Sequence, residues 1–90
     1  MPTVIAYHEL RKETAHWLSS PKREEVLPAL GVSNIRTFVD QENPHQVAVL
    51  MDVDDLDQLR SALQSPSPEL VEAMDYDGVV ADTLTVLVES

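Results

Sequence analysis

One eight-residue segment near the middle of the chain constrains the fold more than any other. Gln46 to Val53 alternates strictly between two sets of side chains, as a strand does when successive residues point to opposite faces of a sheet. One set is Val47, Val49, Met51 and Val53, and the other contains Ala48 and Leu50. Both sets are apolar, so the sequence predicts a sheet in which neither face is left to water.

Three further strands are predicted around this segment. Val32 to Asp40 alternates in the same way, and Gln41 to Pro44 has the composition of a turn, so the two central strands form a hairpin. Thr3 to Glu9 is predicted to be the first strand of the chain, and Thr83 to Glu89 the last.

The segment between the first two strands predicts a helix in two pieces. A helical pattern starts near Lys12 and is interrupted at Ser20, a favoured N-cap type, which is followed by Pro21 at the first helical position. The apolar residues of the second piece are Val26, Leu27 and Leu30. Pro28 shortens this piece and Gly31 ends it.

A second helical region separates the last two strands. Its expected N-cap is Asp54 or Asp55. The apolar stripe of its first part is formed by Leu56, Leu59, Ala62 and Leu63. Ser65 to Glu69 interrupts the region, and a short helix that ends at Gly78 follows.

The order strand-helix-strand-strand-helix-strand predicts an α+β, ferredoxin-like βαββαβ fold, in which two helices cover one face of a four-stranded antiparallel sheet. Ninety residues fit a single domain, residues 1–90. Six apolar side chains fall on the uncovered face: Ile5, Tyr7, Phe38, Ala48, Leu50 and Leu87. A second copy of the chain would cover this patch, so we expect a homodimer through the sheet face.

This outline resembles the dimeric α+β barrel superfamily, whose ferredoxin-like subunits pack sheet against sheet. The resemblance rests on element order and on strands that are apolar on both faces, and it covers nearly the whole chain. The superfamily includes cofactor-free antibiotic-biosynthesis-type monooxygenases, muconolactone isomerases and proteins of ethyl-ether-degradation type. The resemblance implies a small organic ligand between sheet and helices. It also implies, for the oxygenases, a set of asparagine, tryptophan and arginine, types that Asn34, Trp17 and Arg36 supply.

Two histidines are the candidate catalytic residues, because imidazole titrates near neutral pH and can act as a general base. Alternation places His8 on the face of Val4 and Ala6, towards the helices, and His16 lies in the first helix beside Trp17. Each histidine also has a structural interpretation, His8 as a hydrogen-bonded core residue and His16 as a solvated helix residue.

The candidate ligand-binding residues are Tyr7, Trp17, Arg36 and Phe38. Trp17 is equally interpreted as an anchor of the core. Arg36 points to the second sheet face, where it could meet a ligand carboxylate or an acid of a partner subunit.

Charge and composition argue against several classes of partner. Sixteen acidic and six basic residues give a formal charge of −10, which repels phosphate backbones and anionic lipids, so neither nucleic acid nor membrane is an expected partner. Two glycines are too few for a phosphate-cradling loop, so no nucleotide cofactor is expected. The amino terminus has no signal-peptide pattern, and a cytoplasmic location is expected.

No metal site is expected either, because the acidic runs that resemble known motifs lack residues that those motifs require. The run Asp52 to Asp57 begins like an EF-hand loop, but Leu56 holds its fifth position and Leu63 its twelfth. Asp75 to Gly78 resembles the nucleophile motif of haloacid-dehalogenase phosphatases, but a helix precedes it, and we interpret it as a helix end. The chain has no cysteine, and no histidine pair has metal-ligand spacing.

The residues leave two main functions open, beside a third possibility that the chain is a partner subunit of a larger complex. The first is a homodimer that binds a small organic molecule and performs oxygenation, isomerisation or cyclisation by proton transfer, without a cofactor. The alternative is a non-catalytic module that binds a metabolite or a protein. A cavity beside Trp17 and a histidine with a perturbed pKa inside that cavity would favour the first.

Overall fold

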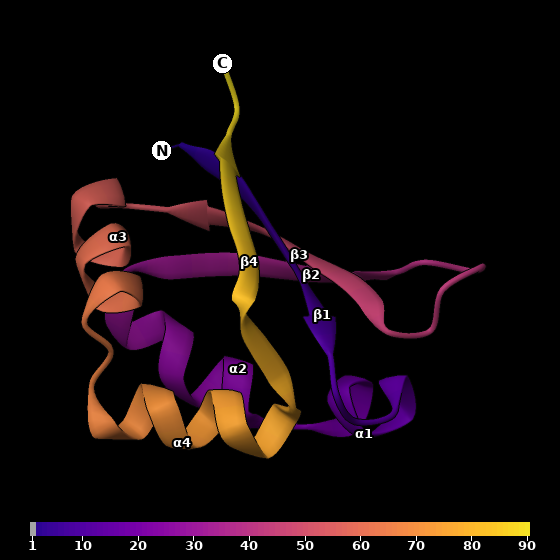
Figure 1. Ribbon diagram of the computed structural model, residues 1–90. Helices are drawn as coiled ribbons and strands as arrows, with labels where there is room; N and C mark the ends of the chain where they lie inside the picture. Colours follow the sequence, from indigo (N-terminus) through magenta and orange to yellow (C-terminus); the bar gives the residue numbers. More distant parts are fainter. Residues whose placement is uncertain (1) are drawn as a thin grey trace.

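The computed structural model describes residues 2–90 and has the predicted order of elements (Figure 1). The strands are β1 (Thr3–Leu10), β2 (Val32–Val39), β3 (Gln46–Val53) and β4 (Val79–Val88). The helices are α1 (Thr14–Ser19), α2 (Lys22–Val26), the 3₁₀ turn η1 (Leu27–Leu30), α3 (Leu56–Gln64) and α4 (Pro68–Asp77). The strands form one sheet in the order β2-β3-β1-β4 with every neighbouring pair antiparallel. The predicted ferredoxin-like α+β fold is therefore confirmed.

The helices cover one face of the sheet, and the core lies between them and the strands (Figure 1). Alternation in β3 buries the predicted set of Val47, Val49, Met51 and Val53. In β1 the buried set is Val4, Ala6, His8 and Leu10. Trp17 of α1 and Leu59 of α3 close the core from the helix side. His8 therefore points towards the helices, as alternation predicts.

The opposite face of the sheet carries the second apolar set. Phe38, Ala48 and Tyr7 are neighbours in one row across β2, β3 and β1, and Leu50, Ile5 and Leu87 form the next row across β3, β1 and β4. Phe38 and Leu87 are each about half exposed, at 48% and 52%. The predicted apolar patch is thus present on the isolated chain.

The first helical segment is divided as predicted, with a one-residue difference at the restart. Ser20 accepts a hydrogen bond from the backbone N–H of Lys22 through its hydroxyl at 3.2 Å, but Pro21 occupies the cap position and α2 begins at Lys22. Gly31 ends η1 with φ of 81°, a left-handed conformation that glycine adopts without a Cβ clash.

The last strand begins four residues earlier than expected, at Val79 instead of Thr83. The register between β1 and β4 shifts between Tyr7 and Glu9, so alternation is interrupted there. The hydroxyl of Thr83 bridges this irregularity, since it accepts from the N–H of Glu9 at 2.8 Å and donates to the carbonyl of Val80 at 2.7 Å. A period-two pattern read from sequence cannot continue through such a shift.

Candidate functional site

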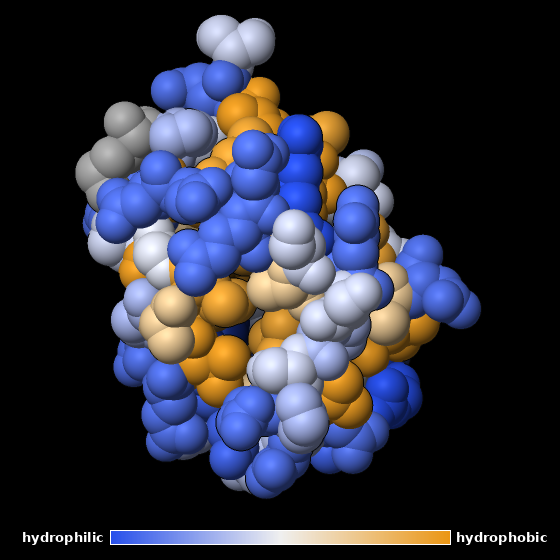
Figure 2. All heavy atoms as spheres, turned by 90° about the vertical axis from the view of Figure 1, so that its left-hand side faces the viewer, coloured by the Kyte–Doolittle hydropathy of each residue, from blue (hydrophilic) through white to orange (hydrophobic). Residues whose placement is uncertain are grey.

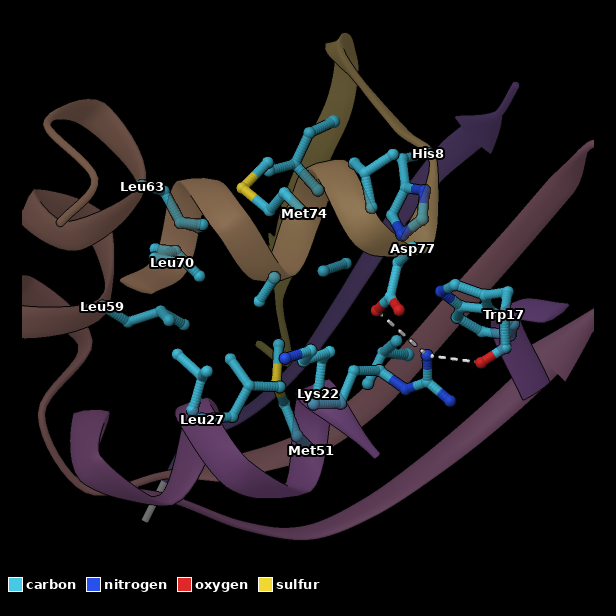
Figure 3. A pocket seen from close by; sticks show the side chains of 17 residues that line it. His8, Trp17, Lys22, Leu27, Met51, Leu59, Leu63, Leu70, Met74 and Asp77 are labelled. Atoms are coloured by element: carbon cyan, nitrogen blue, oxygen red, sulfur yellow. Dashed lines mark hydrogen bonds and ion pairs between the residues drawn. The ribbon is translucent and has the colours of Figure 1, made fainter. Parts of the chain in front are cut away.

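A cavity of about 90 Å³ lies between the sheet and the helices (Figure 3). Strands β1, β3 and β4 form its floor, and helices α1 to α4 and η1 supply its walls. Its apolar lining includes Leu27, Met51, Leu59, Leu63, Leu70 and Met74. The cavity is predominantly apolar, as sites for small organic molecules usually are.

Four polar or aromatic side chains gather at one end of the cavity, each from a different element. His8 comes from β1, Trp17 from α1, Arg23 from α2 and Asp77 from α4 (Figure 3). A few convergent polar groups in an otherwise apolar pocket are what orient a bound molecule. We call these four residues the polar end.

His8 is only 5% exposed, and its hydrogen bonding fixes its tautomer. Nδ1 lies 3.1 Å from the carbonyl oxygen of Glu9, and because a carbonyl only accepts, Nδ1 carries the proton. In the neutral ring, Nε2 then holds the free lone pair. Burial lowers the pKa of His8 below 6.5, the positive charge of Arg23 lowers it further, and the Glu9 hydrogen bond and the charge of Asp77 oppose these effects. The ring is neutral near pH 7 and can accept a proton.

Trp17 is completely buried and is held between His8 and Arg23. The imidazole meets the indole edge-on, with ring centroids 6.0 Å apart and an interplanar angle of 79°. The guanidinium carbon of Arg23 lies 4.2 Å from the centroid of the indole ring, a cation–π arrangement. Nη1 of Arg23 also donates to the carbonyl of Trp17 at 2.9 Å. The indole therefore has a fixed place beside the cavity.

Arg23 and Asp77 form a buried ion pair that links α2 to α4. Nη1 of Arg23 lies 3.6 Å from Oδ2 of Asp77, and Oδ1 of Asp77 is buried without a hydrogen-bond partner among residues 2–90. Burial lowers the pKa of Arg23, which the charges of Asp77 and Glu24 counteract. A guanidinium group has a high ordinary pKa, and the neighbouring carboxylate favours its charged form, so Arg23 stays charged.

The sequence reasoning did not identify Arg23 or Asp77 as site residues, although a signal was present. Arg23 has the helical spacing of one face with Val26, Leu27 and Leu30. Asp77 has the same spacing with Leu70, Ala73 and Met74. An arginine and an aspartate of opposite charge on two apolar stripes indicate a buried pair where the stripes meet.

The remaining predicted site residues lie outside the cavity. His16 packs on Tyr76 with ring centroids 4.8 Å apart, and its Nε2 donates to the carbonyl of Tyr76 at 2.7 Å. Tyr7, Arg36 and Phe38 belong to the open face of the sheet. Of the six predicted residues, the structure brings His8 and Trp17 together at the cavity.

The asparagine, tryptophan and arginine implied by the superfamily resemblance do not lie together in the structure. Trp17 lines the cavity, but Asn34 lies in an irregular stretch of β2 with φ of 52°, and its side chain donates to Asp52. Arg36 is on the open face. An asparagine–tryptophan–arginine site is therefore not formed by these three residues. The arginine beside the tryptophan is Arg23.

The acidic runs have structural roles. Asp55 caps α3, because its Oδ1 accepts from the backbone N–H of Gln58 at 3.1 Å, and Gly78 ends α4 in the left-handed conformation. Within residues 2–90, no three histidine or acidic side chains come together as metal ligands do. In the same described part, no helix has the length and apolar character needed to cross a membrane.

Several solved structures have the same fold and match nearly the whole chain. A candidate antibiotic biosynthesis monooxygenase from Bordetella bronchiseptica has a TM-score of 0.73 at 15% identity, over 99% of this chain and 94% of that chain. SnoaB, a cofactor-independent oxygenase from Streptomyces nogalater, has a TM-score of 0.58 at 12% identity, over 98% and 87%. A dimeric ferredoxin-like protein of unknown function from Bacteroides fragilis has a TM-score of 0.55 at 21% identity, over 98% and 91%.

Comparison with protein-family models and with curated sequences gives no match. At these identities the structural likeness concerns the fold and not the chemistry. The chain has the ferredoxin-like fold of the antibiotic biosynthesis monooxygenase-type proteins, as the order of its elements predicts.

Proposed function

We propose that this protein is a homodimeric α+β barrel that binds a small, mainly apolar organic molecule in the cavity and removes a proton from it with His8. The observation that carries the proposal is the buried imidazole of His8, neutral and with its Nε2 lone pair free, at the polar end of an apolar cavity. Both features that favour an enzyme over a non-catalytic module, a cavity beside Trp17 and a perturbed histidine within it, are present.

The proton transfer balances without any further reagent. Nε2 of His8 takes a proton from an acidic C–H or O–H of the ligand, which gives an imidazolium and a ligand anion. Because Arg23 and Asp77 are paired and their charges offset each other, the imidazolium supplies the net positive charge of the polar end, which favours the ligand anion. A positioned general base contributes a rate factor of roughly 10² to 10⁴. The anion can then react with dioxygen, reprotonate elsewhere or close a ring, which are the oxygenation, isomerisation and cyclisation reactions we propose.

The size of the cavity limits the ligand to about one ring at most. At about 90 Å³ it is smaller than the ~150 Å³ apolar cavity known to accept benzene. Met51 and Met74 line it, and their unbranched, flexible side chains can move to enlarge it. Neither a cofactor nor a metal enters the proposed reaction, and we propose the cytoplasm as its location.

The homodimer is supported by the open sheet face. Its exposed Tyr7, Phe38 and Leu87 form an apolar surface that water disfavours, and a protein of the same fold is described as dimeric. We propose that two copies pack these faces together. A shallow hollow bordered by Ile5, Leu50 and Leu87 lies on this face and would receive side chains of the second copy.

The test is proton exchange from small aromatic carbon acids in deuterated water, followed by proton NMR. Ligands are first selected by quenching of Trp17, the single tryptophan of the chain. We expect exchange catalysed by the wild type to fall by roughly 10² to 10⁴ in His8→Gln. The control is His16→Gln, which changes a histidine outside the cavity and leaves the rate unchanged.

Binding without exchange would instead support the alternative, a non-catalytic ligand-binding module. A loss of exchange in His16→Gln as large as that in His8→Gln would contradict His8 as the base.

A further inference from the structure

The carboxylate of Asp77 is an unusual feature of the cavity, because one of its oxygens is buried without a partner. Asp77 is 3% exposed, its Oδ2 faces Arg23 at 3.6 Å, and its Oδ1 accepts no hydrogen bond from residues 2–90. A buried carboxylate oxygen without a donor carries a desolvation cost that folding does not recover. Because Asp77 is one of the residues that line the cavity, its unpartnered oxygen is a position where a donor is missing.

The neighbouring side chains do not supply that donor. Arg23 is held in place by its hydrogen bond to the carbonyl of Trp17 and by its position over the indole ring. Nδ1 of His8 donates to Glu9, so in the neutral ring Nε2 is an acceptor and offers Oδ1 no proton. Figure 3 shows the carboxylate of Asp77 beside the His8 ring, with the indole nitrogen of Trp17 turned to the same side, but no hydrogen bond joins that nitrogen to Oδ1.

We infer that Asp77 is the specificity-determining residue of the cavity and accepts a hydrogen bond from a hydroxyl or N–H group of the bound organic molecule. This inference rests on the proposed function and deepens it, since it names the substrate class. The substrate is an otherwise apolar molecule with a donor group at one end. Its donor meets Oδ1 of Asp77, and its apolar body fills the part of the cavity lined by Leu59, Leu70 and Met74.

The position of Asp77 discriminates against two kinds of ligand. A ligand with a methyl group in place of the hydroxyl leaves Oδ1 unpartnered, and sites built around a polar contact discriminate strongly against such analogues. A ligand whose polar group only accepts offers Oδ1 no donor and also leaves that oxygen unpartnered.

The experiment compares two probes of nearly equal shape, 4-fluorophenol and 4-fluorotoluene, by fluorine NMR titration of the whole protein. We expect the wild type to bind 4-fluorophenol at least tenfold more tightly, the ratio that one charge-assisted hydrogen bond provides. In the double variant Arg23→Met/Asp77→Leu the ratio falls to about one. Removing both partners avoids leaving a buried unpaired charge, which keeps the fold.

A matched control uses the exposed ion pair at the end of the same helix. Arg11 and Asp75 are bonded at the surface, away from the cavity lining, so Arg11→Met/Asp75→Leu leaves the tenfold ratio intact. If the Arg23→Met/Asp77→Leu variant does not fold, Asp77→Asn keeps the shape of the side chain and is expected to lower the ratio by removing the charge.

Equal affinity of the wild type for the two probes would overturn the inference, because the hydroxyl of the ligand would then gain nothing from Oδ1, and it would leave the proposed function standing. A ratio that survives both Asp77 variants would also overturn it. Binding of neither probe would overturn both the inference and the proposed cavity ligand.

Discussion

The two faces of the sheet are formed by the same four strands but differ in how far their apolar side chains are buried. On the covered face, aliphatic side chains pack with Trp17 and Leu59 into a buried core, whereas Phe38 and Leu87 on the open face remain half exposed. Full burial of one large apolar side chain is worth about 1.5–3 kcal/mol, so the covered face accounts for most of the stability of the monomer. The open face carries apolar surface that folding of the monomer leaves exposed to water and that association can bury.

A second contrast exists between the surface of the molecule and the cavity. Hydrophilic residues cover much of the side shown in Figure 2, whereas the side chains of Arg23 and Asp77 are only 13% and 5% exposed. A core that needed only stability would use apolar residues at these two positions, since replacing a buried pair by them is often neutral or stabilising. Their presence beside His8 is the physical argument for a binding site.

The largest effect is expected from breaking the buried ion pair alone. Asp77→Leu leaves Arg23 unpaired in a buried place and should lower the free energy of unfolding by about 3–5 kcal/mol. Asp75→Leu, which breaks the exposed pair with Arg11, should cost at most about 1 kcal/mol. Urea denaturation followed by circular dichroism measures both, and equal losses would contradict the buried character of the Asp77 pair.

The next largest effect is a difference in stability between the same substitution, leucine to alanine, on the two faces of the sheet. Leu59→Ala, at a side chain that is 1% exposed, should cost about 2–5 kcal/mol of unfolding free energy. Leu87→Ala, on the open face, should change the stability of the monomer by no more than about 0.5 kcal/mol. Urea titration at high dilution makes the comparison, and a large loss in Leu87→Ala under these conditions would show that the open face already stabilises the monomer.

Dissociation of the dimer tests the open face directly. Phe38→Asp places a charge on this face, and we expect the molar mass by light scattering at micromolar concentration to fall by about half, because an unpaired charge would have to be buried. Leu18→Asp is the matched control, since Leu18 on α1 is 49% exposed and Phe38 is 48% exposed. A wild type of monomer mass, or dissociation by both variants, would refute the proposed interface.

The smallest effect is the pH dependence that His8 introduces. Its pKa is lower in the folded chain than the ordinary 6.5, so the unfolded chain binds more protons as the pH falls through 6.5. Stability is therefore highest above pH 6.5 and decreases towards pH 5.5. In His8→Gln this part of the pH dependence should disappear. Urea midpoints of both proteins at pH 7.5 and 5.5 measure it, and an identical pH dependence would show that His8 titrates normally in the folded state.

Much of the fold was predictable because each local signal acts within a few residues. The alternation of Gln46 to Val53 predicted the bounds of β3 and its buried set. One of the two cap candidates, Asp55, and the glycine Gly78 mark helix ends in the structure. The start of β4 was misplaced, because the irregular pairing near Glu9 depends on two strands that are far apart in sequence.

The candidate site was only partly predictable. Alternation correctly turned His8 towards the helices, but the same reasoning could not say which helix residues would face it. Arg23 and Asp77 are 54 positions apart along the chain by their numbering, and they meet only because α2 and α4 pack together over the sheet. Tyr7, Arg36 and Phe38 were grouped with the site by residue type, and the structure places them on the other face.

By itself, the sequence determined the order of the elements, the apolar character of both sheet faces and the direction of His8, because alternation, helical spacing and capping are local properties of the chain. Tertiary structure decided which side chains share a cavity and that Arg23 pairs with one oxygen of Asp77. It also placed His16 outside the cavity. The physical reason is that burial, ion pairing and pKa depend on contacts between distant segments, which exist only once the helices have packed on the sheet.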